Sequence, residues 1–129
     1  MKNLLSLILS KDDVIMGKKV SQTDIINAEK ELGLEFSNEY RKYLMEFGCI
    51  AFDGREFTGI CDIDRLNVVC VTNDEKKFNQ CIPINWYVIE QANIDGIVIW
   101  QSSTGEIYQT SPNSKPIKLC DSLSEYIDM

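Results

Sequence analysis

The chain has 129 residues, a length typical of one domain with one hydrophobic core. It is 44% hydrophobic and 26% charged, as ordinary globular proteins are. Its net charge is −7, and binding to nucleic-acid phosphates or to an anionic membrane surface requires a basic face. We therefore expect neither as a partner, whereas the charge favours attraction to a basic protein.

The negative charge is concentrated in the second part of the chain. Residues 1–48 hold eight acids and seven bases, whereas residues 49–129 hold twelve acids and six bases. Between Lys77 and Lys115 there is no Lys or Arg that could neutralise the acids of that segment, which are Glu90, Asp95 and Glu106. The acidic surface is either simply solvated or faces a partner, and net charge does not distinguish the two.

The first 20 residues predict a short helix and a polar connector. Leu4, Leu7 and Ile8 suit one face of a helix that docks on the core. This apolar run is far shorter than the roughly 20 residues that span a bilayer. No small-residue cleavage site follows it, so we expect no signal peptide. The connector is predicted over 14–19.

Two short helices are predicted between residues 21 and 48. In the first, residues 21–24 supply the start signal, and one face is formed by Ile25, Ala28 and Leu32. Gly33 follows at the position where a helix often ends in a left-handed residue. In the second, Ser37 can cap the first turn and Gly48 repeats the stop. Its apolar stripe consists of Tyr40, Tyr43, Leu44 and Phe47.

The middle of the chain predicts two short strands, over 50–52 and 57–60. Asp53 and Gly54 are a common hairpin pair, in a loop expected to be slightly longer than two residues. Residues 63–66 are ambiguous. Residues 68–71 are rich in β-branched side chains, and propensity alone does not decide between strand and helix there.

The C-terminal part predicts an antiparallel meander and a last helix. Strands are expected over 86–90, 97–100, 106–110 and 117–119, with turns over 93–96 and 102–105. Asp121 or Ser122 can cap a final helix that carries Leu123, Tyr126 and Ile127. The predicted fold is therefore α+β, a single domain over residues 1–129. Its mainly antiparallel sheet is covered by the N- and C-terminal helices.

The residues that common enzyme mechanisms need are absent. The chain has no His, which excludes Ser-His-Asp and Cys-His arrangements, and no Gly-rich phosphate-binding motif. We expect no catalytic site, cofactor or metal. The alternative is a carboxylate-dependent hydrolase, in which Mg²⁺ or Ca²⁺ is held by the acids Asp53, Glu56, Asp62 and Asp64. Those residues lack the pattern of an EF-hand loop.

Five cysteines are present: Cys49, Cys61, Cys70, Cys81 and Cys120. No two have Cys-x-x-Cys spacing, as close-spaced zinc ligands would. An odd count without a secretory signal fits free thiols in a reducing cytoplasm, where we place the protein. We expect these cysteines to be small hydrophobic residues of the core.

Trp86 and Trp100 lie in predicted strands. Each is either a core residue or an exposed anchor, since Trp is enriched at binding hot spots. With the acids they form the predicted partner-binding set of Asp53, Glu56, Asp62, Asp64, Trp86, Glu90, Asp95, Trp100 and Glu106.

Residues 21–127 contain an ordered series of motifs. The series opens with Glu-Lys-Glu-Leu-Gly-Leu at 29–34 and Glu-Tyr-Arg-Lys-Tyr-Leu at 39–44, followed by Phe47-Gly48 and by the spaced Gly54 and Gly59. It continues with Asn67-Val68-Val69 and Thr72. Pro83 then precedes the predicted strand 86–90, and the series ends with the segment 122–127. This series resembles the SMI1/KNR4 (SUKH) superfamily.

The resemblance implies the same sheet-and-helix fold, with residues 68–71 leading into a helix. It also implies a binding module. Bacterial members act widely as immunity proteins that neutralise a cognate toxin, often a nuclease. We therefore expect a toxin partner with a basic surface. The alternative is an intracellular regulatory scaffold, as the fungal members imply. Oligomeric state is left open.

Overall fold

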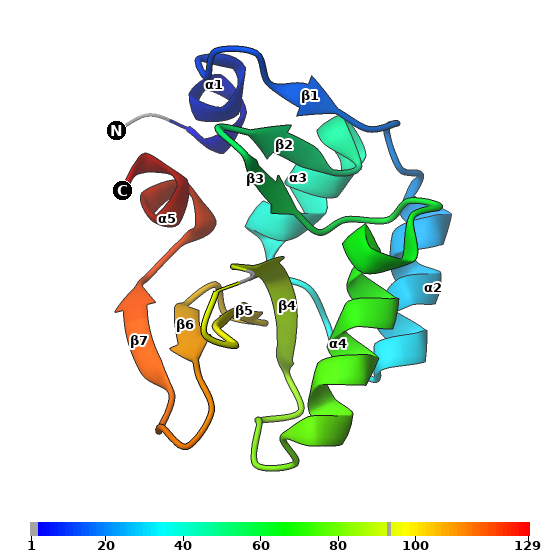
Figure 1. Cartoon of the computed structure of the whole chain (residues 1–129). Coiled ribbons are helices and arrows are strands. Elements are labelled where there is room, and N and C mark those ends of the chain that lie inside the picture. The colour runs from blue at the N-terminus through cyan, green and yellow to red at the C-terminus, as the bar shows by residue number, and fades with distance from the viewer. Residues whose placement is uncertain (1–2, 93) are drawn as a thin grey trace.

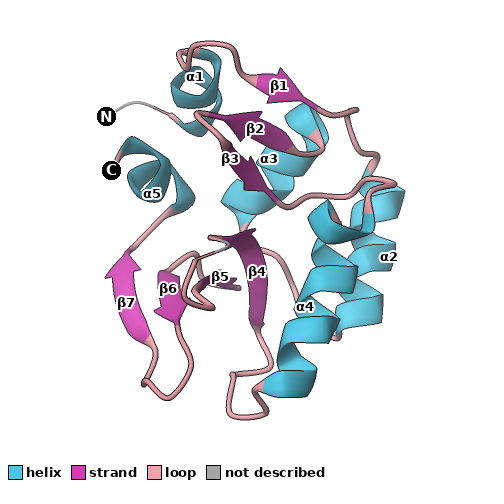
Figure 2. Cartoon of the chain, viewed as in Figure 1, coloured by secondary structure: helices cyan, strands magenta, loops and turns pink. Residues whose placement is uncertain are grey.

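The computed structural model describes residues 3–92 and 94–129 as one antiparallel sheet with helices packed against it (Figures 1 and 2). The sheet order is β1-β2-β3-β4-β5-β6-β7, so each strand pairs with its neighbour in sequence. The predicted α+β fold with an antiparallel meander is confirmed. The elements are α1 (Leu4–Leu9), β1 (Ile15–Met16), α2 (Gln22–Leu32), α3 (Asn38–Phe47), β2 (Ile50–Phe52), β3 (Arg55–Phe57), the 3-10 helix η1 (Asp64–Leu66), α4 (Val68–Phe78), β4 (Trp86–Gln91), β5 (Val98–Ser102), β6 (Ile107–Thr110), β7 (Ile117–Cys120) and α5 (Leu123–Asp128).

Helices α2 and α3 begin and end at the predicted residues. The Ser21 hydroxyl accepts the Asp24 N–H at 3.2 Å, and the Ser37 hydroxyl accepts the Tyr40 N–H at 3.1 Å. Gly33 ends α2 with a φ of 69°, a left-handed conformation that glycine adopts without steric cost.

The main core lies between one face of the sheet and the helices α1, α2, α3 and α5. All the predicted apolar positions of the first three helices are buried. Helices α1 and α5 pack side by side, so the two ends of the chain close one side of this core (Figure 1). From the sheet, the core receives Ile50, Phe52, Phe57, Tyr87, Ile89, Ile99 and Ile107.

Helix α4 lies beside β4, along the part of that strand with which β3 does not pair. Strand β3 pairs with β4 only at Phe57 and Glu90. Further along β4, the Val88 N–H donates a hydrogen bond to the buried Thr72 hydroxyl of α4, at 2.9 Å. The Asn67 side-chain oxygen caps α4 by accepting the N–H groups of Val69 and Cys70, which favours a helix in spite of the β-branched sequence.

Three details differ from the sequence-based expectations. The polar connector contains β1, in which Ile15 pairs with Ala51 of β2. The β2–β3 turn has only two residues, Asp53 and Gly54, and both have positive φ. Strand β3 therefore ends at Phe57 instead of beginning there. Asn93 of the predicted 93–96 turn lies outside the described residues.

Candidate protein-binding surface

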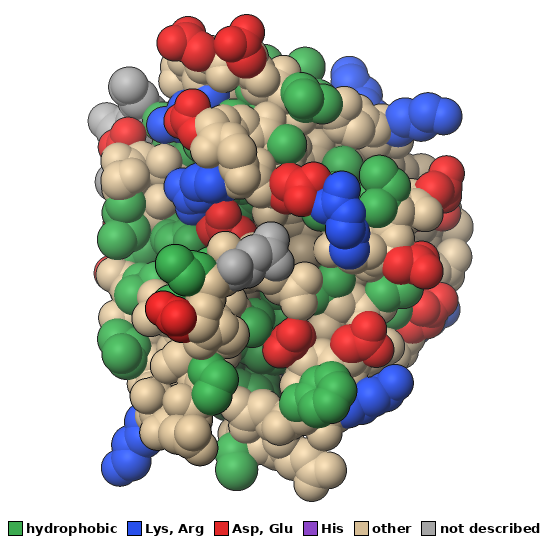
Figure 3. All heavy atoms as spheres, in the orientation of Figure 1, with side chains coloured by type: hydrophobic (Ala, Val, Ile, Leu, Met, Phe, Trp, Pro, Cys, Tyr) green, Lys and Arg blue, Asp and Glu red, His purple; other side chains and the backbone are tan. Residues whose placement is uncertain are grey.

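A groove of about 640 Å³ opens between the end of α4, the β4–β5 turn and the loop from β6 to β7. Ile82, Val98 and Trp100 line it and are buried, so the groove has an apolar floor. Phe78 of α4 stands in one wall and is 87% exposed. The opposite wall is the 111–116 loop. In Figure 3 the groove is the hollow at the lower centre, with apolar side chains inside it.

The floor exists because the sheet buries a second, smaller apolar cluster on the face opposite the main core. Side chains alternate along β4, so Tyr87 and Ile89 enter the main core while Trp86 and Val88 enter this cluster. The Trp86 ring stacks on Tyr108 with centroids 4.1 Å apart.

The two tryptophans are core residues. Trp86 is 8% exposed and Trp100 is 1% exposed. The Trp100 indole N–H donates to the Thr110 hydroxyl at 2.8 Å, so its polar atom is satisfied inside the protein. Of the two alternatives, the structure shows core packing, and neither ring is available as an exposed anchor.

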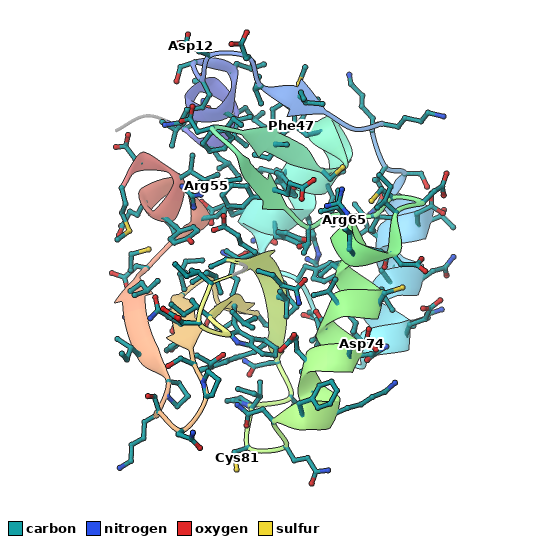
Figure 4. The ribbon with its side chains drawn as sticks, viewed as in Figure 1. Asp12, Phe47, Arg55, Arg65, Asp74 and Cys81 are labelled. Atoms are coloured by element: carbon teal, nitrogen blue, oxygen red, sulfur yellow. The ribbon has the colours of Figure 1, made fainter. Side chains whose placement is uncertain are left out.

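Glu90 is not part of an unneutralised acidic surface, which corrects the expectation from the sequence. It is 5% exposed, and the Arg55 guanidinium donates to both of its carboxylate oxygens, each at 2.9 Å. The Tyr126 hydroxyl donates to the same carboxylate. The Arg55 guanidinium lies between the β2–β3 hairpin and α5 and faces the rings of Phe52, Phe57 and Tyr126 (Figure 4).

The cluster of Arg55, Glu90 and Tyr126 joins three elements, β3, β4 and α5. Burial raises the pKa of Tyr126, and its hydrogen bond to Glu90 raises it further. The Arg55 pKa is raised chiefly by the hydrogen bonds to Glu90. The Arg55 guanidinium and the Tyr126 hydroxyl therefore both donate to the Glu90 carboxylate, and the raised pKa of Tyr126 keeps its phenol neutral at physiological pH. We assign it a structural role.

The other predicted acids lie on several separate elements. Glu56 of β3 pairs with Arg65 of η1, and Figure 4 shows Arg65 beside this part of the sheet. Glu106 accepts hydrogen bonds from the hydroxyls of Thr104 and Ser102, which lower its pKa. Of the predicted acids, Asp53, Asp62, Asp64 and Asp95 are exposed and form no ion pair with a described residue. On the face in Figure 3, acidic side chains are spread out, with Lys and Arg among them.

The cysteines are free thiols. Cys81 is exposed, which contradicts the prediction that it is a core residue, and the other four are half-buried. Burial, and secondarily the neighbouring Cys61, raises the pKa of Cys49 to about 11. Burial also raises the pKa values of Cys70 and Cys120. At neutral pH these three thiols are protonated and therefore weak nucleophiles.

No group of three or more Cys, Asp or Glu side chains in 3–92 and 94–129 is placed to hold a metal ion. None of the described helices combines the length and apolarity needed to cross a bilayer.

Sequence reasoning missed the groove because its walls come from distant segments. Residues 75–82 form one wall and residues 110–116 the other. One signal was present in the sequence: the large apolar Phe78 directly follows the charged run 74–77.

A family model described as SMI1-KNR4 cell-wall, of the SUKH group, matches residues 22–127. A search of curated proteins gave no match. The family match spans most of the chain, from the start of α2 into α5. The chain therefore belongs to the SMI1/KNR4 (SUKH) family.

Proposed function

We propose that the chain is a non-catalytic protein-binding module that acts as an immunity protein and neutralises a cognate toxin such as a nuclease. The observation that carries the proposal is the family match over residues 22–127, because bacterial proteins of this superfamily act widely in that role. The net charge of −7 supports it, since a nuclease that holds phosphates has an electropositive active site.

The physical mechanism is charge-steered docking on a preformed surface. Among the predicted contact acids, Asp53, Asp62, Asp64 and Asp95 are exposed and form no ion pair with a described base. Complementary charge mainly accelerates association, and buried apolar contacts then slow release. Bound in this way, the module blocks the toxin's active site without performing a reaction.

Co-expression with the toxin encoded beside its gene tests the proposal. Cells should survive toxin induction only when this protein is present. If they die as readily with it as without it, the proposed function is wrong. A catalytically inactive form of the same toxin then allows the association rate to be measured by stopped flow, at low and high ionic strength.

A pair of variants tests whether Asp62 and Asp64 steer the association. The double change Asp62→Asn and Asp64→Asn should slow association, and added salt should reduce the difference from wild type. Glu46→Gln removes an exposed acid of α3, outside the predicted set, and serves as the control. Equal slowing per charge removed in the two variants would show that net charge acts and that Asp62 and Asp64 have no special part.

A further inference from the structure

The groove beside α4 carries two opposite charges on facing walls. Glu75 of α4 lines one wall and Lys115 of the β6–β7 loop lines the other. Neither forms an ion pair with a residue of the described chain. Glu75 accepts a hydrogen bond from the neutral Gln91 carboxamide at 3.0 Å, which positions its carboxylate and leaves the charge uncompensated.

The bases nearest to Glu75 in the sequence are directed elsewhere. The Lys76 ammonium donates to the Ile84 carbonyl at 2.9 Å. Lys77 pairs with Asp74 at 3.6 Å. The carboxylate of Glu75 is therefore available to a cation supplied from outside the chain.

Between the charges lies an apolar floor of suitable size. Ile82, Val98 and Trp100 form it, and Phe78 stands 87% exposed in the wall. The volume of about 640 Å³ falls within the roughly 300–1,000 Å³ of typical ligand sites. An exposed phenylalanine beside a buried apolar floor provides the contact surface that an inserted apolar side chain needs.

We infer that this groove binds an extended segment of a partner protein in which one apolar side chain is flanked by a basic and an acidic residue. The apolar side chain lies above the floor of Ile82, Val98 and Trp100 and packs chiefly on the exposed ring of Phe78. The basic residue pairs with Glu75, and the acidic residue pairs with Lys115. Because the two charges differ in sign, they also fix the direction in which the segment crosses the groove. This inference rests on the proposed protein-binding function and adds the chemistry of the bound segment.

A displayed library of random dodecapeptides, selected on the full chain, tests the inference without knowledge of the toxin. Selection should enrich peptides with an aromatic or aliphatic residue between a Lys or Arg and an Asp or Glu. The single change Glu75→Lys should instead enrich peptides in which both flanking residues are acidic. Selected peptides should bind Phe78→Ser about tenfold more weakly, a change of about 1.4 kcal/mol.

Ile15→Ser is the matched control, because Ile15 is also exposed and apolar but lies on β1, outside the groove. It should leave peptide affinity unchanged, and circular dichroism should show that all variants are folded. The inference is overturned if no peptides are enriched, if Phe78→Ser binds them as wild type does, or if Glu75→Lys still enriches peptides with one basic and one acidic flanking residue. Protection in the co-expression assay together with any of these results would reject the groove and retain the immunity function.

Discussion

At the scale of single residues, Gly59 marks a place where two backbone segments meet without room for a side chain. A Cβ added to Gly59 would lie 1.6 Å from the Gly48 carbonyl oxygen. Its own N–H and carbonyl bond to Leu66 and Val68, so the segment cannot move aside freely. We expect Gly59→Ala to lower the free energy of unfolding by about 3 kcal/mol or more, measured by urea denaturation.

Gly33→Ala provides the comparison for this prediction. Nothing lies within 4 Å of the position of its added Cβ, and only the φ of 69° disfavours a side chain. The expected loss is about 1 kcal/mol, the cost of a left-handed residue. Equal losses for Gly33→Ala and Gly59→Ala would contradict the close approach at Gly59.

Glu90 and Arg55 illustrate how strongly a buried charge depends on its partner. Glu90→Gln places a neutral amide against the Arg55 guanidinium and should cost about 2 kcal/mol of unfolding free energy. In an Arg55→Met background the same change should be neutral or stabilising, because it removes an unpaired buried carboxylate. A double-mutant cycle by urea denaturation measures this, and additive effects of the two changes would disprove the coupling.

At the scale of elements, one buried hydroxyl hydrogen-bonds α4 to the backbone of β4. Thr72 is fully buried, and its hydroxyl oxygen accepts the Val88 N–H that no neighbouring strand takes. Thr72→Val keeps the shape but leaves this N–H without a partner. We expect a loss of about 1–3 kcal/mol in unfolding free energy and faster hydrogen exchange of the Val88 amide. Thr72→Ser keeps the hydroxyl, so the Val88 amide should stay protected from hydrogen exchange in that variant. If the Val88 amide exchanges equally fast in the Ser and Val variants, the Thr72 hydroxyl does not protect it.

The elements differ in how well the sequence predicted them, for local physical reasons. Helices α2 and α3 were predicted because their caps and apolar stripes lie within the same short segment. Strand β1 was not, because its two residues are exposed and it exists only by pairing with β2. For α4, propensity left strand and helix open at the β-branched start, and the choice depends on the Asn67 cap and on contact with β4.

At the scale of the whole molecule, the chain uses both faces of one sheet. The main core on one face takes up most of the apolar side chains, and the smaller cluster around Trp100 on the other face leaves a groove beside α4. The sequence predicted which acids could face a partner but not which of them form ion pairs within the chain. Arg55 is 35 positions from Glu90 in the chain, and only the β3–β4 pairing brings the two together.

The core also makes the stability of the whole molecule sensitive to alkaline pH. Burial is the main cause that raises the pKa above the ordinary 10.0 in each of four tyrosines: Tyr40, Tyr43, Tyr87 and Tyr126. Above pH 10 the unfolded chain loses phenolic protons that the folded chain keeps. The free energy of unfolding is therefore unaffected by these groups below about pH 10 and falls as the pH rises further.

We expect alkaline unfolding in which phenolate absorbance and loss of circular dichroism occur together above pH 10. Tyr126→Phe removes one of the four groups, so the slope of unfolding free energy against pH should become less steep by about one proton. The Phe variant should also be less stable at neutral pH, because Glu90 loses the Tyr126 hydrogen bond. If these four tyrosines ionise near pH 10 while the secondary structure stays intact, water reaches their hydroxyls. That result would contradict their burial in the core.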